Sequence, residues 1–166
     1  TLVSFAVTSD DVKNVASGSF KKSGDNVYLV TVPYSAELAP DFDVFTTNSN
    51  NLYELNSQKK IAAMYPVCAG GIAEAVTKMA MGNKIGVKID HLPFSATAAG
   101  FDKIKKVTPK DLFTPLYGSI IVEADGELDL DGFAEGTAFK IGNTVSDAEI
   151  QVEVDNIPGV KIDLAD

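Results

Sequence analysis

The chain has 166 residues, of which 45% are hydrophobic and 22% are charged. These are the proportions of an ordinary globular domain, and one domain of this length buries roughly 70% of the surface that its unfolded chain exposes. The formal net charge of −9 argues against a nucleic-acid surface, because no basic stripe could outweigh that field. A phosphorylated ligand would therefore have to be held by backbone groups and a few lysines.

Cys68 is the single cysteine, which excludes an intrachain disulfide and a zinc site built on cysteines. This usage predicts a reducing, cytoplasmic location. No apolar run reaches the roughly 20 residues that span a membrane, and no segment resembles a signal peptide. The chain begins at Thr1 inside an apolar alternation and ends at Asp166 in mid-pattern. We therefore expect residues 1–166 to be a single domain of a larger, multidomain chain.

The first 60 residues predict two strands and two helical regions. Residues 2–8 alternate as a strand, and Ser9 to Asp11 can cap a short helix over 12–17. Residues 27–32 form a second strand, which Pro33 closes. Two helical stretches follow, over 42–47 and 52–60, with one helix interrupted by asparagines as the alternative.

The middle of the chain predicts a strand, a helix and a strand in succession. Residues 61–68 are apolar on both faces, which is typical of a central strand. The helix begins after Gly71, carries an apolar face at helical spacing, and ends near Gly82 and Asn83. Residues 85–89 alternate as a strand, and the weakly periodic region 90–107 is expected to be mostly loop.

The last third predicts strands. A helical turn at 109–113 precedes the strongest of them, residues 119–124, and an acidic turn or short helix follows at 125–132. Strands are then expected over the ranges 138–144, 148–154 and 159–164, the last two paired across a turn. The whole pattern predicts an α+β fold, a mixed, largely antiparallel sheet with helices packed on it.

The junction of residues 61–76 is the most informative segment, because an apolar strand meets Gly70-Gly71 and a helix starts at once. Two glycines let backbone approach a ligand closely, and the unpaired N–H groups of a first helical turn favour an anion. The N–H groups of Gly70, Gly71 and Ile72 are therefore candidate phosphate ligands. A plain turn before a helix is the alternative for the same residues.

Two lysines are the candidate cationic partners of that phosphate. Lys21 and Lys22 lie in a polar turn that we expect near the glycine pair, although two solvated loop lysines are the alternative. Neither a Walker loop nor a GxGxxG motif is present, so the domain does not resemble a self-contained nucleotide-hydrolysing unit.

The acidic segment imitates the start of a calcium loop, with Glu127, Asp129 and Asp131 at alternate positions before Gly132. The twelfth position needs a bidentate glutamate, and Ala138 stands there instead. A solvated acidic turn is therefore the interpretation, and no metal ligands are predicted.

Nucleophilic catalysis has no candidate constellation. His91 is the single histidine and is expected at the surface, no Gly-x-Ser-x-Gly elbow exists, and Cys68 is expected in a buried strand, where an apolar setting blunts a thiol. We predict no catalytic residue.

Several segments, taken in order along the chain, resemble the C-terminal type domain of the AIR synthase superfamily, and most closely that of the phosphoribosylformylglycinamidine synthases. Each segment is loose by itself, and their order and spacing make the combination specific. They are residues 3–7 with 11–13, 18–29, 70–82, 112–123, 142–145 and 160–164.

The resemblance implies a function in purine biosynthesis. Such ligases convert formylglycinamide ribonucleotide, ATP and glutamine to formylglycinamidine ribonucleotide, and the parent enzyme uses ATP and Mg²⁺. The resemblance implies one wall of a phosphate- or nucleotide-binding cleft. Its partners would be an AIR synthase N-terminal-type domain and a glutaminase domain of the same chain, and the isolated domain would be inactive.

The sequence departs from the family pattern directly before the glycine pair, where the family usually carries polar residues. Here the run is Tyr65-Pro66-Val67-Cys68-Ala69, in which only the Tyr65 hydroxyl is a candidate for acid/base chemistry. This favours the more degenerate, nucleotide-holding half of a two-half enzyme. A non-catalytic docking domain, or the C-terminal domain of AIR synthase, of a thiamine-phosphate kinase or of a selenophosphate-type kinase, stays open as an alternative.

Overall fold

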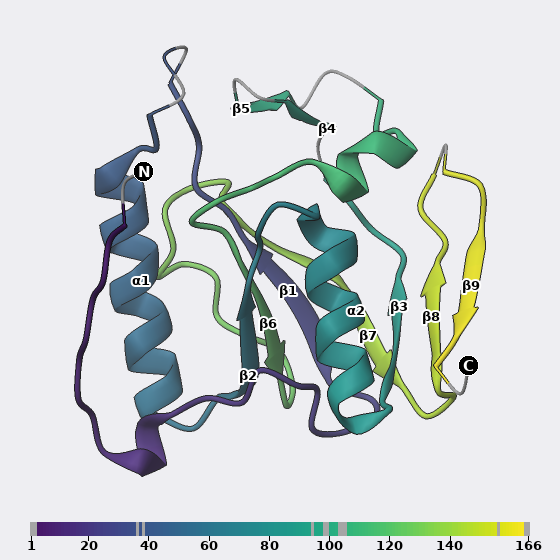
Figure 1. Ribbon diagram of the computed structural model, residues 1–166, viewed down its shortest axis with the longest axis horizontal. Helices are drawn as coiled ribbons and strands as arrows, with labels where there is room; N and C mark the ends of the chain where they lie inside the picture. The colour runs from purple at the N-terminus through teal and green to yellow at the C-terminus, as the bar shows by residue number, and fades with distance from the viewer. Residues whose placement is uncertain are drawn as a thin grey trace.

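The computed structural model describes residues 3–35, 37, 39–93, 95–97, 100–102, 106–155 and 157–164. Its centre is a seven-stranded sheet in the order β2-β6-β1-β7-β3-β8-β9, accompanied by two α-helices (Figure 1). The strands of this sheet are β1 Asn26–Val30, β2 Ile61–Pro66, β3 Gly86–Ile89, β6 Ile120–Ala124, β7 Ala138–Val145, β8 Glu149–Val152 and β9 Val160–Asp163.

The other elements lie around this sheet. They are the helices α1 Phe42–Ser57 and α2 Gly71–Asn83, the short 3₁₀ helices η1 Val12–Asn14 and η2 Pro109–Phe113, and a separate pair of strands, β4 Ser95–Thr97 and β5 Gly100–Asp102. None of the described helices is long and apolar enough to cross a membrane.

Within the sheet, β3 and β8 pair in parallel and every other neighbouring pair is antiparallel. The predicted α+β class, with a mixed and largely antiparallel sheet, is confirmed. The separate β4–β5 pair lies in the region predicted to be mostly loop.

The core lies on both faces of the sheet. All five residues of β1 are buried, and because successive side chains point to opposite faces, Val27 and Leu29 pack with α2 while Tyr28 and Val30 pack with α1. Each buried Val or Leu side chain contributes about 1.5–3 kcal/mol relative to an exposed one. The two helices therefore cover opposite faces of one shared sheet.

The helix α1 is continuous across the asparagine-rich stretch. Asp41 caps its first turn by accepting from the N–H groups of Asp43 and Val44. The buried Asn48 donates its amide to the Thr31 carbonyl and accepts from the Ala134 N–H, at 3.0 and 2.9 Å. The two predicted helical stretches are thus one helix, in which this asparagine joins neighbouring loops to the helix.

The strand β2 lies at the edge of the sheet, so the prediction that it is central is wrong. Its outer side is accompanied by the chain near Ser17, whose carbonyl accepts from the Met64 N–H at 2.9 Å. Residues Ile61 and Ala63 are buried because each face of the sheet carries a helix. Burial on both faces therefore did not require a strand neighbour on both sides.

Residues 3–11 form no strand, contrary to the prediction for residues 2–8; residues 1 and 2 lie outside the described chain. Val3, Phe5 and Val7 are 82%, 89% and 79% exposed. The predicted alternation is present, but a strand also needs a hydrogen-bonding neighbour, and no described segment pairs with this one. We call residues 3–8 the N-terminal arm.

A buried carboxylate anchors the loop before β1. Glu123 of β6 is fully buried and accepts from the backbone N–H groups of Lys21 and Lys22 at 2.9 and 3.1 Å. Burial raises the pKa of the Glu123 carboxyl above its ordinary value, and the two N–H groups oppose that rise.

Glu123→Gln provides a test through pH. A group whose pKa is raised on folding stabilises the fold most below its ordinary pKa of 4.5, and that contribution is lost as pH rises through the raised value. We expect the free energy of unfolding of the native chain, relative to Glu123→Gln, to fall as pH rises from 4.5, by at most about 1.4 kcal/mol per pH unit. Urea unfolding of both proteins at several pH values measures this difference in unfolding free energy. A difference that does not change with pH would contradict a raised pKa of Glu123.

Candidate functional site

The candidate site is the edge of the sheet at which both α-helices begin, at the top of Figure 1. The strands β1 and β2 both run antiparallel to β6 and therefore parallel to each other, and α1 and α2 follow them in the chain. The N-termini of both helices consequently lie at this edge. Helix N-termini favour anions. We call it the helix-start edge.

At this edge the N–H groups of the glycine pair already have partners. The Gly70 N–H donates to the Glu74 carboxylate at 2.6 Å, and the Gly71 N–H donates to the Cys68 carbonyl at 3.1 Å. Ile72 follows in the first turn, with a side chain buried in the core. Of the three predicted phosphate ligands, two therefore donate within the protein.

Gly71 is required by a close approach of backbone. Its φ is +69°, a left-handed conformation that favours glycine. A Cβ on it would lie 2.5 Å from the Leu112 carbonyl oxygen and 2.8 Å from that of Thr114. The chain that packs against this glycine is thus the end of η2, whose start is fixed by a capping box between Thr108 and Asp111.

Glu74 places a negative charge at the start of α2. Its carboxylate lies 2.5 Å from the Lys78 ammonium, and that ammonium, followed by the Gly70 N–H, lowers the pKa of the Glu74 carboxyl. A carboxylate here compensates the positive end of the helix dipole. An incoming phosphate would have to compete with it for the Gly70 N–H.

The lysines lie at the opposite end of α2 from the glycine pair. The loop that carries them is joined to the last turn of the helix, where the Phe20 N–H donates to the Met79 carbonyl at 3.0 Å and Asn83 donates to the Phe20 carbonyl at 2.8 Å. A helix of 13 residues is about 20 Å long. The expectation that Lys21 and Lys22 lie near Gly70 and Gly71 is therefore wrong.

The anion that this lysine loop holds is one of the protein's own. The backbone N–H groups of Lys21 and Lys22 bind Glu123, and the Lys22 ammonium lies 3.2 Å from Asp125 and 3.8 Å from Asp25. Those carboxylates raise the pKa of Lys22, with Asp125 as the largest cause. The charge of Lys22 is thus directed to neighbouring acidic groups.

Aromatic side chains are exposed at the helix-start edge. Phe42 and Phe45 of α1 are 67% and 40% exposed, and Tyr117 is 54% exposed. The Tyr34 hydroxyl donates to the Tyr117 carbonyl, and Phe45 lies beside Gly118. Sequence reasoning missed this group, because its members are brought together from three separate segments. Exposed aromatic surface of this kind is typical of a contact with another domain or a ligand.

Within the described residues, no group of three His, Cys, Asp or Glu side chains is arranged to hold a metal ion. His91 is exposed, as predicted. Cys68 is only partly buried and lies beyond the end of β2, so the prediction that it lies in a buried strand is wrong. The described residues therefore offer no preformed three-ligand site for Mg²⁺.

Comparison with known proteins gives structural matches. No protein-family model matches the chain, and no curated sequence does. PurL from Thermotoga maritima in complex with ADP superposes with a TM-score of 0.72 over 93% of this chain, at 10% identity. The chain has the fold of a PurL domain. The predicted resemblance is confirmed for the fold, and the chain spans 27% of the length of that PurL.

Two further solved structures agree with the PurL fold. Phosphoribosylformylglycinamidine synthase II from Thermotoga maritima has a TM-score of 0.72 and 10% identity, with 90% of this chain and 27% of that chain covered. HypE in the HypE–HypF complex has a TM-score of 0.60 and 15% identity, with 89% of this chain and 55% of that chain covered.

The two glycines should differ in their tolerance of a side chain. Gly71→Ala is expected to lower the free energy of unfolding by more than about 2 kcal/mol, because it combines a left-handed backbone with a clash against backbone atoms. Gly70→Ala is the matched control and should cost less than Gly71→Ala, since Gly70 has φ −89° and the atoms nearest to its Cβ would be side-chain atoms of Glu74, the closest at 2.6 Å, instead of backbone. Thermal unfolding measures both, and equal losses would contradict the packing role of Gly71.

Proposed function

We propose that this chain is one domain of a PurL-like, ATP-dependent carbon–nitrogen ligase of purine biosynthesis, in which its helix-start edge forms one wall of a ligand cleft. The observation that carries the proposal is the fold match to PurL over 93% of this chain. Structures of that PurL are complexes with ADP, with ATP and with FGAR, which is consistent with a parent enzyme that binds phosphorylated ligands.

In this role the domain helps to bind and orient a ligand and does not supply the reacting groups. The helix-start edge offers the dipole of α2, the first-turn N–H groups at Ile72 and Ala73, and the exposed aromatic side chains of α1. The titratable side chains of the first turns of α2, Glu74 and Lys78, are already paired with each other. We therefore propose that another domain supplies the catalytic groups and that the isolated chain does not turn over substrate.

Phosphate binding at Gly70, Gly71 and Ile72 belongs to this proposal and has a structural condition. The Glu74 carboxylate must turn away from the Gly70 N–H before a phosphate oxygen can accept from it. Lys21 and Lys22 take no part in this binding, because they lie at the far end of α2.

A second candidate function is a docking domain of the same kind of enzyme, with no ligand at the glycine pair. It is favoured by Glu74, which already occupies the Gly70 N–H, and by the end of η2, which covers Gly71. The likeness to HypE, a hydrogenase maturation protein, favours as a further alternative a role in another protein with this fold.

Titration of the ¹⁵N-labelled chain with ADP, followed by NMR, separates the two candidates. A ligand wall predicts saturable shifts of the Gly70, Gly71 and Ile72 amides, with Lys21 and Lys22 unmoved. Glu74→Gln should tighten binding about two- to tenfold by removing a like charge, whereas Glu54→Gln, far along α1, changes the net charge equally and should not. Absence of shifts at the glycine pair would favour the docking domain, and ATP hydrolysis by the chain alone would overturn the proposed inactivity.

A further inference from the structure

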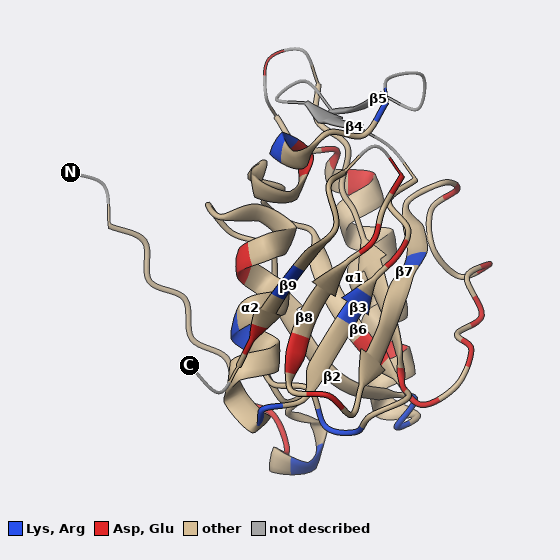
Figure 2. Ribbon diagram, turned by 90° about the vertical axis from the view of Figure 1, so that its right-hand side faces the viewer, with Lys and Arg blue, Asp and Glu red and all other residues tan. Residues whose placement is uncertain are grey.

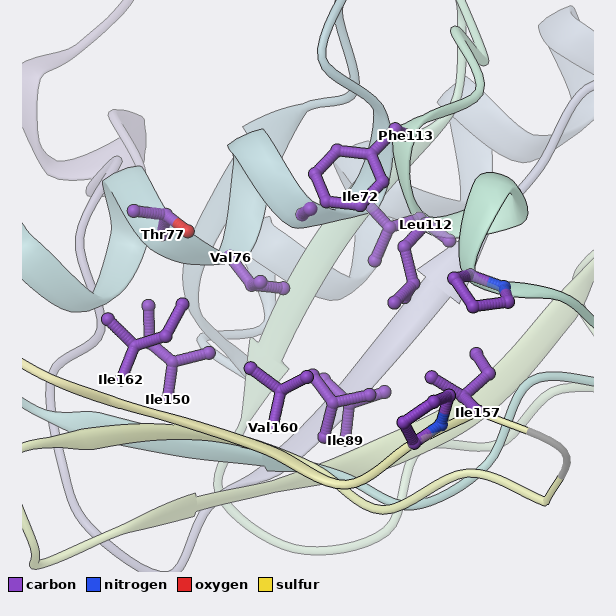
Figure 3. Close-up of a pocket in the computed structure, with 14 residues that line it drawn as sticks. Ile72, Val76, Thr77, Ile89, Leu112, Phe113, Ile150, Ile157, Val160 and Ile162 are labelled. Atoms are coloured by element: carbon purple, nitrogen blue, oxygen red, sulfur yellow. The ribbon is translucent and has the colours of Figure 1, made fainter.

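An apolar groove of about 190 Å³ lies between α2 and the strands β8 and β9. Figure 3 shows Ile72 and Val76 of α2 on one side and Ile150, Val160 and Ile162 of the two strands on the other, with their side chains pointing into the same space. The lining is apolar apart from Thr77. This end of the sheet therefore presents hydrophobic surface that α2 does not cover.

The groove is bordered by a sheet edge that is open in the described chain. The strand β9 pairs with β8 on one side and is the last strand of the sheet. Val160 and Ile162, which are 40% and 50% exposed, line the groove, and the alternate residue Lys161 faces away from it. An edge of this kind offers backbone N–H and C=O groups to an added strand.

The N-terminal arm has the pattern of such a strand. Val3, Phe5 and Val7 fall on one side of an extended chain, and the small residues Ser4, Ala6 and Thr8 fall on the other. Figure 2 shows the arm standing away from the body of the domain. The same chain thus carries an open strand edge beside an apolar groove and an unpaired apolar strand segment.

One copy cannot bring its own arm to its own groove. The base of the arm is fixed near β2, because Asn56 donates to the Asn14 carbonyl at 2.6 Å and Ser17 bridges to Ala63. The edge at β9 lies across all seven strands, about 29 Å away, and the arm and β9 are on opposite sides in Figure 1. Val7 is only seven residues before the fixed Asn14, a reach of at most about 25 Å, so the whole arm cannot lie along its own β9.

We propose that the arm of one copy adds as a strand to the β9 edge of a second copy, with Val3, Phe5 and Val7 facing the groove. The match extends to both faces of the added strand. Its apolar residues would continue the surface of Val160 and Ile162, while Ser4 and Thr8 would lie on the polar face with Lys161. Each copy has one arm and one edge, so two copies exchange arms and close a dimer.

Sedimentation equilibrium of the 166-residue chain tests the exchange. We expect a dimer of twice the 17.6 kDa chain mass at about 100 μM. Phe5→Ser disrupts the arm and Ile162→Lys disrupts the β9 edge, so each should shift the chain to monomer. Both side chains are at least half exposed, so neither substitution should unfold the domain. Phe42→Ser removes another exposed phenylalanine, one that lies outside the arm and β9; it is the matched control and should stay dimeric.

Mixing the two monomeric variants gives a result that unfolding cannot imitate. Phe5→Ser retains an intact edge and Ile162→Lys retains an intact arm, so an equimolar mixture should recover a one-armed dimer. A native chain that remains monomeric at about 100 μM, a dimer that survives both substitutions, or a mixture that stays monomeric would each overturn the proposal.

Discussion

The close approach of residues 112–114 to Gly71 is the contact on which the helix-start edge depends. It joins the first turn of α2 to the segment that leads into β6, a central strand. Only a glycine permits it, because the backbone is left-handed and carbonyl oxygens occupy the space of a Cβ. A glycine pair before a helix can therefore serve the packing of the protein's own chain, and any ligand at this edge must bind around that packing.

The helix α2 is held in different ways at its two ends. At its start, Glu74 accepts from Gly70 and compensates the helix dipole. At its end, the loop of Lys21 and Lys22 joins the last turn to the buried Glu123. In both places the anion that satisfies exposed N–H groups is a carboxylate of the protein. Gly70, Lys21 and Lys22 are residues of the kinds that bind phosphate. In this protein their backbone N–H groups donate instead to Glu74 and Glu123.

The sequence predicted the elements well and their spatial neighbours poorly. Helical spacing of apolar residues predicted α2, and short apolar runs predicted the strands that became β1 and β6, which are buried almost throughout. It did not reveal that β2 is an edge strand, since helices on both faces produce the same apolar run as strand neighbours do. The predicted position of the Lys21 loop was wrong for a related reason. The residue types in a loop do not indicate which end of a distant helix the loop will contact, and here it contacts the C-terminal end of α2.

Amide hydrogen exchange of the Gly71→Ala variant tests the central claim most directly. If residues 112–114 depend on Gly71, exchange should accelerate over 110–114 and in the first turn of α2. The amides of Lys21 and Lys22, bound to Glu123 at the other end of the helix, should keep the protection that they have in the native chain. Equal acceleration at both ends, or unchanged exchange over 110–114, would contradict the account.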